Sequence, residues 1–496
     1  MSAELKTGTP WSWRLGLWLM VAILAFLANI LSARLGYRGQ AILGFFALIL
    51  LAASFSTDLR AINAKTIIWG LILQFALGFL VLYVDQVQAF FRVIGSGITT
   101  LVDCADKGAD FVFGSLSKVD GPAGFVFAFK ALPPIIFVSA FFSLLYYLGV
   151  LQFLVSIMAK VMMFLMGTSG AETLSVAANV FMGQTEAPLI VKPFVPKMTR
   201  SELLALMASG MAHISGGMMA VYISYGADPV AILTTCIMAC PCSLYLTKLV
   251  LPELQKPVTM GDAKIVVEKT HVNAVDAIAS GVKDGLFLAL NVAAMLIAFI
   301  AFIALFDAML SSIKPALLWM RVPAEWLSSW PSNLQLQDIF GFLFRPIAIL
   351  IGVSPDDATK VGGLLGIKLA ANEHVAFLML KKGNQITDLT LWAQTLHSFH
   401  HSAFQSTIYA INEHIAALSK NGGDQFAFLS PRSKLLAVFA LTGFANFASV
   451  GIQIGGIGSI APERRHDLAR LGMKALFVGF LATLVNACVA GMLMKE

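Results

Sequence analysis

Gly183-Gln184-Thr185-Glu186-Ala187-Pro188 is a polar stretch inside an otherwise apolar segment that runs from Met158 to Pro196. A carboxylate inside an apolar membrane segment is costly unless it meets a partner or water. The glycine and the proline free backbone amides and carbonyls, which a membrane tolerates only where they line a cavity. The segment therefore predicts a helical hairpin that enters a membrane and turns back beside a polar site.

The composition of the whole chain also indicates that much of its surface faces lipid. Of the 496 residues, 58% are hydrophobic and 12% are charged, about half the charged share of a soluble domain. The net charge of +6 is small and lies mostly in short loops, unlike a nucleic-acid groove. We therefore predict a multi-pass protein of the plasma membrane or bacterial inner membrane, in contact with lipid and without a nucleic-acid partner.

A second apolar segment, Ile339 to Leu380, repeats the design around Ala371-Asn372-Glu373-His374. Each hairpin is followed by an interrupted apolar span, broken at Ser215-Gly216-Gly217 in the first case and between Gly443 and Gly451 in the second. Interrupted segments in corresponding positions of two halves are the best sequence pointer to a transporter site. The chain is therefore expected to be an all-α transporter built from two repeats.

The spacing of these features predicts an insertion in the second repeat. Glu186 precedes Gly216 by 30 residues and Glu373 precedes Ser449 by 76, and the excess of 46 matches the polar stretch from Lys381 to Arg432. His397 and His401 in this stretch would share a helix face. No carboxylate with zincin spacing accompanies them, so a polar surface insertion is favoured over a metal site.

Five regions follow from this order. Residues 1–130 are expected to form N-terminal scaffold helices and an interfacial segment, and 131–260 the first repeat with its hairpin and broken helix. Residues 261–337 are expected to hold an interfacial helix and a scaffold helix. Residues 338–460 form the second repeat with an insertion at about 381–428, and 461–496 the last membrane helix. The expected spans are Trp13–Leu31, Ala41–Phe55, Thr66–Val84, Leu132–Leu154, Leu203–Tyr225, Val230–Leu251, Leu286–Leu310, Leu435–Ile457 and Leu468–Met494, with Pro257–Gly285 on the surface and Ser311–Gln337 as a loop.

The polar clusters also indicate a class of ligand. Gln184, Thr185, Asn372 and Asn446 place amides and a hydroxyl near the two carboxylates, and neither cluster contains Lys or Arg. Such a site suits a neutral solute rich in hydroxyls and ring nitrogens, and Phe444 or Phe447 could pack on a planar ring. The alternative is a structural network that joins helices. Neither carboxylate has a nucleophile–base pair or a metal triad near it in sequence, so no enzyme and no cofactor are expected.

Several motifs, in order from about residue 131 onward, resemble the concentrative nucleoside transporter family. They are Gly183 to Leu189, Gly366-Ile367-Lys368, Asn372 to Phe377, Leu429 to Ser433, Gly443 to Ser449, and Ala461 to Arg465. The resemblance implies a homotrimer in which each chain has eight membrane helices and two re-entrant hairpins arranged as inverted repeats. It implies nucleoside–cation symport by alternating access. The remaining alternatives are a membrane-embedded hydrolase and a channel that use the same carboxylates.

The resemblance also implies roles for single residues. The base would be bound by Gln184, Thr185 and Glu186 with Met218 nearby, the ribose by Glu373, Asn446 and Ser449, and Phe444 would line the site. Sodium would be held by the side chain of Asn179, the backbone of Met182 and Ile214, and the position of His213.

Two residues depart from the family pattern. His213 stands where the family has a small hydroxyl residue, and His374 where it has an aromatic one. Imidazole is a poor ligand for sodium, a hard cation that prefers oxygen. His213 therefore leaves a proton as the alternative coupling ion, or turns away and hydrogen-bonds elsewhere.

Orientation follows from basic residues. Arg464, Arg465, Arg470 and Lys474 flank the start of the last span, so the positive-inside rule predicts a cytoplasmic loop there. Both chain termini are then expected outside.

Overall fold

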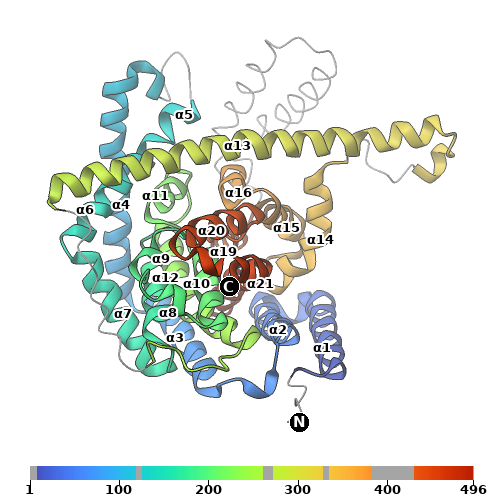
Figure 1. Ribbon diagram of the computed structural model, residues 1–496. Coiled ribbons are helices and arrows are strands. Elements are labelled where there is room, and N and C mark those ends of the chain that lie inside the picture. Colours follow the sequence, from blue (N-terminus) through green and yellow to red (C-terminus); the bar gives the residue numbers. More distant parts are fainter. Residues whose placement is uncertain (1–7, 119–125, 261–271, 328–333, 381–428, 495–496) are drawn as a thin grey trace.

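The computed structural model describes residues 8–118, 126–260, 272–327, 334–380 and 429–494 (Figure 1). Within these ranges the secondary structure is entirely helical. Eight of the described helices are long and apolar enough to cross a membrane, or up to nine spans if one bent pair is counted. The predicted all-α fold with about eight spans is confirmed. The predicted insertion at about 381–428, with its histidines, lies outside the described residues.

The described part of the N-terminal region contains five α-helices. They are α1 (Trp11–Ile30), α2 (Ser32–Ser54), α3 (Ala64–Tyr83), α4 (Asp85–Phe113) and α5 (Phe127–Lys130). In α4, Phe91, Ile98, Val102 and Ala109 are buried among largely exposed neighbours. Helix α4 therefore has one apolar face, as the amphipathic spacing of this segment predicts.

The first repeat follows. It contains α6 (Pro133–Tyr147), α7 (Val150–Met166), α8 (Gly170–Ala178), α9 (Ala187–Ile190), α10 (Arg200–Ala212), α11 (Gly216–Ser224) and α12 (Pro229–Val250). The prediction of one span from Leu132 to Leu154 is wrong, because Gly149 adopts a φ of +84° and separates α6 from α7. The predicted breaks, in the hairpin and at Ser215, are confirmed.

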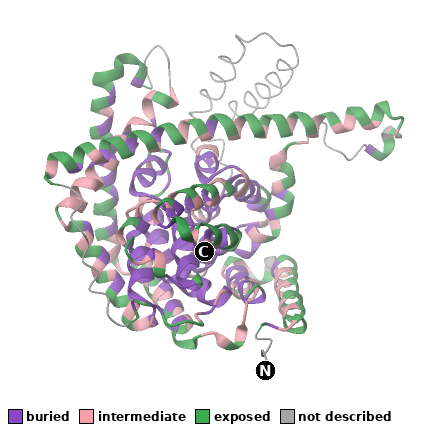
Figure 2. Ribbon diagram, in the orientation of Figure 1, coloured by how far each residue is buried: buried purple, intermediate pink, exposed green. Residues whose placement is uncertain are grey.

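The second repeat has the same plan. Helices α14 (Leu336–Leu350) and α15 (Pro355–Ala370) are bent by 117° to each other. They are followed by α16 (Glu373–Leu380), by the broken span α19 (Pro431–Leu441) and α20 (Phe447–Ile460), and by α21 (Arg465–Leu493). Helices α10, α12 and α21 are mostly buried and form the centre of the molecule (Figure 2).

Matching caps begin the helices of the two repeats. Ser169 and Thr199 form capping boxes with Glu172 and Glu202 at the starts of α8 and α10. Ser354 and Ser430 cap α15 and α19. The side-chain oxygens satisfy N–H groups that the first turn of a helix leaves without partners. These caps fix where each hairpin and each broken span begins.

One long helix replaces three predicted segments. Helix α13 (Ala274–Trp319) has 46 residues and crosses the whole view in Figure 1. The predicted span Leu286–Leu310 lies inside this helix, but the boundary predicted at Gly285 and the start of a loop predicted at Ser311 are wrong. A Cβ on Gly281 would lie 2.6 Å from the Cα of Ala140, and one on Gly285 would lie 2.7 Å from the Cα of Ile136. These glycines let α13 pack closely against α6 without ending the helix.

Candidate functional site

The tip of the first hairpin is bonded to the broken span of the second repeat. Gln184 Nε2 donates to Ser449 Oγ over 3.1 Å, and Gln184 Oε1 accepts from Gln453 Nε2 over 3.1 Å. Gln453 is fully buried, and its amide also donates to the carbonyl of Met207 over 2.9 Å. The structure thus brings together residues that the sequence places in separate clusters.

Glu373 is the buried carboxylate of the second hairpin. Its Oε1 accepts from the hydroxyl of Tyr222 over 2.9 Å, and its Oε2 accepts from Asn446 Nδ2 over 2.9 Å. The Oδ1 of Asn446 accepts from the backbone N–H of Ser449 and so caps the N-terminus of α20. A buried carboxylate is tolerated because donors face it. Helices α11, α16 and α20 therefore hold Glu373 in one orientation.

The other predicted residues of the first hairpin are arranged differently. Glu186 is only partly buried, and its Oε2 accepts from the backbone N–H of Gly183 over 3.0 Å within its own loop. Thr185 faces Gly456 of α20, where a Cβ would lie 2.8 Å from its methyl carbon. Met218 is buried in the first turn of α11, which Ser215 caps. Glu186 therefore lies near the same site with a more open side chain than Glu373.

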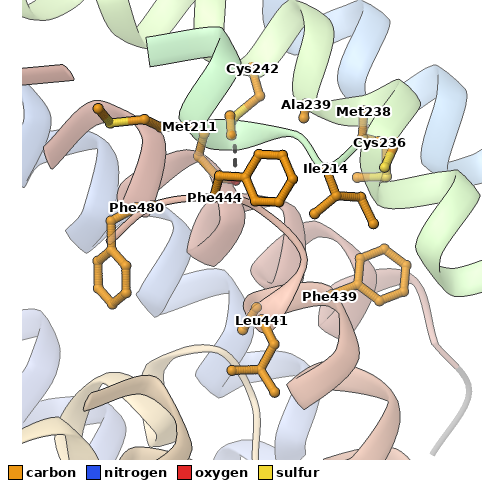
Figure 3. Close-up of a cluster of buried hydrophobic side chains, with 14 of the residues drawn as sticks. Met211, Ile214, Cys236, Met238, Ala239, Cys242, Phe439, Leu441, Phe444 and Phe480 are labelled. Carbon is orange, nitrogen blue, oxygen red and sulfur yellow. Dashed lines mark hydrogen bonds between the residues drawn. The ribbon is translucent and has the colours of Figure 1, made fainter. Parts of the chain in front are cut away.

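The two breaks in the spans meet at Phe444. Its backbone N–H donates to the carbonyl of His213 over 3.0 Å. Its ring belongs to a buried apolar cluster with Met211 and Ile214 (Figure 3). Phe447, the other aromatic candidate, is 51% exposed. Of the two phenylalanine candidates, Phe444 is therefore the buried one.

Asn179 presents an oxygen where the first hairpin breaks. It is the C-cap of α8, and its Nδ2 donates to the Ser175 carbonyl over 3.1 Å and to Ser209 Oγ over 3.0 Å. Its Oδ1 is buried, with no hydrogen-bond partner among the described residues. A buried oxygen without a donor suits a cation. Met182 and Ile214 lie in the adjoining breaks, which the N–H of Gly216 ties together through the carbonyl of Phe181 over 3.1 Å.

The ring of His213 has partners of its own. Its Nδ1 lies 2.7 Å from the Ser209 carbonyl and its Nε2 lies 3.3 Å from Cys240 Sγ. Facing a carbonyl, Nδ1 must carry the proton, and Nε2 can then accept from the thiol. Both ring nitrogens are satisfied in the neutral form. The sequence left two alternatives for His213, a proton-coupling group or a ring that hydrogen-bonds elsewhere. The geometry favours the second.

Sequence reasoning missed four polar partners. Tyr222 and Gln453 were not singled out, although Gln453 is the one amide in the apolar run Ile452 to Ile457. His374 Nε2 lies 3.0 Å from the hydroxyl of Tyr225. Lys368, which the sequence analysis gave only as part of a motif, is fully buried at the end of α15, five positions before Glu373.

Comparison with known proteins covers most of the chain. Residues 231–491 match the family described as "Na+ dependent nucleoside transporter C-terminus", residues 43–116 its N-terminus, and residues 128–229 a "nucleoside recognition" gate family. An uncharacterised transporter of Haemophilus influenzae is 36% identical over 91% of this chain and 97% of its own length. Sodium/nucleoside cotransporter 1 of Mus musculus is 36% identical over 90% of this chain, which spans 62% of the mouse protein.

Solved structures show the same similarity. CNTnw in an inward-facing substrate-bound state has a TM-score of 0.75 and 35% identity, with 92% of this chain and 97% of that chain covered. A variant of CNTnw in an outward-facing state gives a TM-score of 0.75 and 34% identity over the same shares.

Proposed function

The chain belongs to the family of Na+-dependent nucleoside transporters, and we propose that its two polar clusters form one nucleoside site with a sodium site beside it. The protein is a multi-pass integral protein of the cell membrane and a sodium-coupled nucleoside symporter that works by alternating access. It is not an enzyme, and sodium rather than a proton is the coupling ion. The alternatives of a hydrolase and a channel are thereby set aside.

The contact between the two repeats carries the proposal for the nucleoside. Gln184 of the first hairpin and Ser449 of the second repeat are 3.1 Å apart, close to Asn446 and Glu373. A carboxylate that accepts from neutral donors has lone pairs left for sugar hydroxyls. Glu373, Asn446 and Ser449 would therefore hold the ribose.

The base would lie toward the first hairpin. Gln184 offers both a donor and an acceptor in one plane, which suits the edge of a base. Thr185, Glu186 and Met218 line the same end, and the ring of Phe444 would pack nearby. The more open side chain of Glu186 supports a role for it toward the polar ligand.

The sodium site would use oxygens at the breaks. The Oδ1 of Asn179, which has no hydrogen-bond partner in the described part of the chain, supports it and would be joined by the backbone carbonyls of Met182, His213 and Ile214. Sodium is cargo here, bound with the substrate and released with it. Its oxygen preference fits this donor set, whereas the ring of His213 would stay with Ser209 and Cys240.

We also propose a homotrimer in contact with lipid. Helix α13 is long and largely exposed in the single chain, with apolar residues such as Phe287, Ile297 and Phe302 facing outward. Apolar surface of this extent suits lipid and neighbouring copies. The mass of the purified protein in a native-like detergent tests the assembly.

Transport in proteoliposomes tests the nucleoside site. We expect Glu373→Gln to abolish the uptake of labelled uridine and adenosine under a sodium gradient, because an amide loses charge-assisted hydrogen bonds worth about 1.5–3 kcal/mol each. Counterflow of unchanged substrate in the wild-type protein distinguishes transport from chemistry. Uptake by the variant at near wild-type affinity would remove Glu373 from the site.

A matched control is Glu253→Gln. Glu253 is also a carboxylate with hydroxyl and ammonium partners, Thr199 and Lys248, but it follows the end of α12. Its loss should affect stability and leave nucleoside affinity unchanged.

A further inference from the structure

Lys368 is a fully buried lysine in the last turn of α15. Its Nζ donates to the carbonyl of Ala440 over 2.7 Å and to Thr483 Oγ1 over 2.9 Å. It also lies 5.4 Å from the centre of the Phe480 ring. The side chain thus links the second hairpin to α19 and α21.

These three partners are those of a charged ammonium. The Thr483 hydroxyl gives its own proton to the carbonyl of Phe480 over 2.9 Å, so its oxygen can only accept from Lys368. The carbonyl and the aromatic face also attract a positive charge. A neutral amine could donate to both oxygens, but it would then turn its lone pair toward the negative face of the Phe480 ring.

The contact with Ala440 is at the end of a helix. Helix α19 ends at Leu441, and the N–H that would normally serve the Ala440 carbonyl, that of Phe444, is bonded to His213 instead. Carbonyls in the last turn lack partners and carry the negative end of the helix dipole. Lys368 supplies the missing donor and a positive charge together.

The corresponding place in the first repeat is where Asn179 lies. Asn179 at the end of α8 contacts Ser209 in the last turn of α10, as Lys368 at the end of α15 contacts Ala440 in the last turn of α19. In the first repeat the Asn179 oxygen is left for a cation. In the second repeat the cation is already part of the chain.

We propose that the Lys368 ammonium is a built-in cation of the second repeat, which caps α19 and keeps Glu373 ionised for the ribose. This rests on the proposed role of Glu373. Glu373 begins α16 five positions after Lys368 and both side chains are buried, so their opposite charges are close and little screened by solvent. Lys368 is a positioning residue that acts through Glu373 and does not itself touch the substrate.

Transport kinetics test the charge. Lys368→Met should raise the KM for uridine about tenfold or more, because Glu373 loses its positive neighbour and with it the strength of a charge-assisted bond. Lys368→Arg, which keeps the charge, should recover most of the affinity. Lys248→Met is the matched control. Lys248 is also a buried lysine, but its Nζ pairs with Glu172 Oε2 at 2.7 Å and has no contact with Lys368 or Glu373 among the described residues. It should lower the Tm and leave the KM within about twofold of wild type.

A double-mutant cycle tests the coupling without transport. The Tm in detergent is measured at fixed sodium for wild type, Lys368→Met, Glu373→Gln and the double variant. Paired charges are not independent, so Lys368→Met should lower the Tm much less when residue 373 carries Gln. A lysine that served only as a helix cap would give additive shifts, and additivity would overturn the proposal.

The outcomes separate the two claims. If wild type takes up no nucleoside, the proposed function fails, while the Tm cycle still decides the coupling. An unchanged KM in Lys368→Met would overturn the proposal even if uptake is sodium-driven. If Lys368→Met alone does not fold, recovery of folded protein in the double variant supports the coupling, and failure of the double variant where Glu373→Gln folds contradicts it.

Discussion

At the scale of single residues, the bonding of His213 predicts how nucleoside uptake depends on pH. Its two ring nitrogens are engaged by Ser209 and Cys240 in the neutral form. We expect uptake at saturating sodium to change little between about pH 8 and about pH 5.5, the range in which an unperturbed His titrates. His213→Ser should leave this profile flat. Uptake driven by a proton gradient without sodium, and lost in His213→Ser, would show that the ring takes part in coupling.

Asn179 is the residue that should set sodium affinity. Asn179→Leu removes the one side-chain oxygen of the proposed site. The sodium concentration for half-maximal uptake should therefore rise at least about tenfold, which corresponds to a loss of about 1.4 kcal/mol in sodium binding. Ser209→Ala is the control, since it removes a partner of the Asn179 Nδ2 and a bond to the Leu206 carbonyl but leaves the Asn179 oxygen in place. The sodium dependence of uridine uptake measures both. An unchanged sodium dependence in Asn179→Leu would place the ion elsewhere.

At the scale of the elements, the break between α19 and α20 depends on Gly443. Its φ is +142°, and a Cβ there would lie 2.7 Å from the Thr483 methyl carbon and 3.0 Å from the Met211 carbonyl. Gly443→Ala should therefore destabilise the protein by roughly 1–3 kcal/mol, through backbone strain and crowding. The Tm in detergent measures this loss.

Gly451→Ala is the matched control for that element. Gly451 lies inside α20 with nothing within 4 Å of the added carbon. Alanine there should be neutral or stabilise the helix by up to roughly 1 kcal/mol. Equal losses in the two variants would show that the break tolerates a side chain and needs no glycine.

At the scale of the whole molecule, basic residues from distant parts of the chain meet at the start of α21. Arg464 donates to the carbonyls of Pro196 and Met198 over 2.9 and 2.6 Å, which brings its loop beside Arg200. Arg200 in turn pairs with Asp467 over 3.4 Å. The first repeat and the loop before α21 thus contribute basic residues to the same place, as expected of a cytoplasmic face.

The C-terminus is therefore predicted to lie outside the cell. A C-terminal reporter that is active only in the cytoplasm should stay inactive, and one active only outside should work. A fusion placed after residue 196, in the loop beside Arg464, should give the opposite result. A cytoplasmic signal from the C-terminal fusion would reverse the orientation and leave the transport assignment unaffected.

The sequence by itself determined the class of protein, most of the spans, the two interrupted hairpins and the residue types of the proposed site. These follow from local rules, because an apolar run or a carboxylate inside one has the same cost wherever it packs. The caps at Ser169, Thr199, Ser354 and Ser430 are local as well, since each bonds within its own first turn. The motifs that resemble the family are also continuous in the chain.

Only the tertiary structure decided the partners. Tyr222 bonds Glu373 across 151 residues and Gln184 bonds Ser449 across 265, and hydrogen bonds depend on direction and distance that no spacing in the chain encodes. The same holds for Lys368, which reaches Ala440 72 residues away. The close packing of α13 on α6 depends on Gly281 and Gly285, at the place where hydropathy alone indicated a boundary. Packing between distant helices, rather than local preference, chose these contacts.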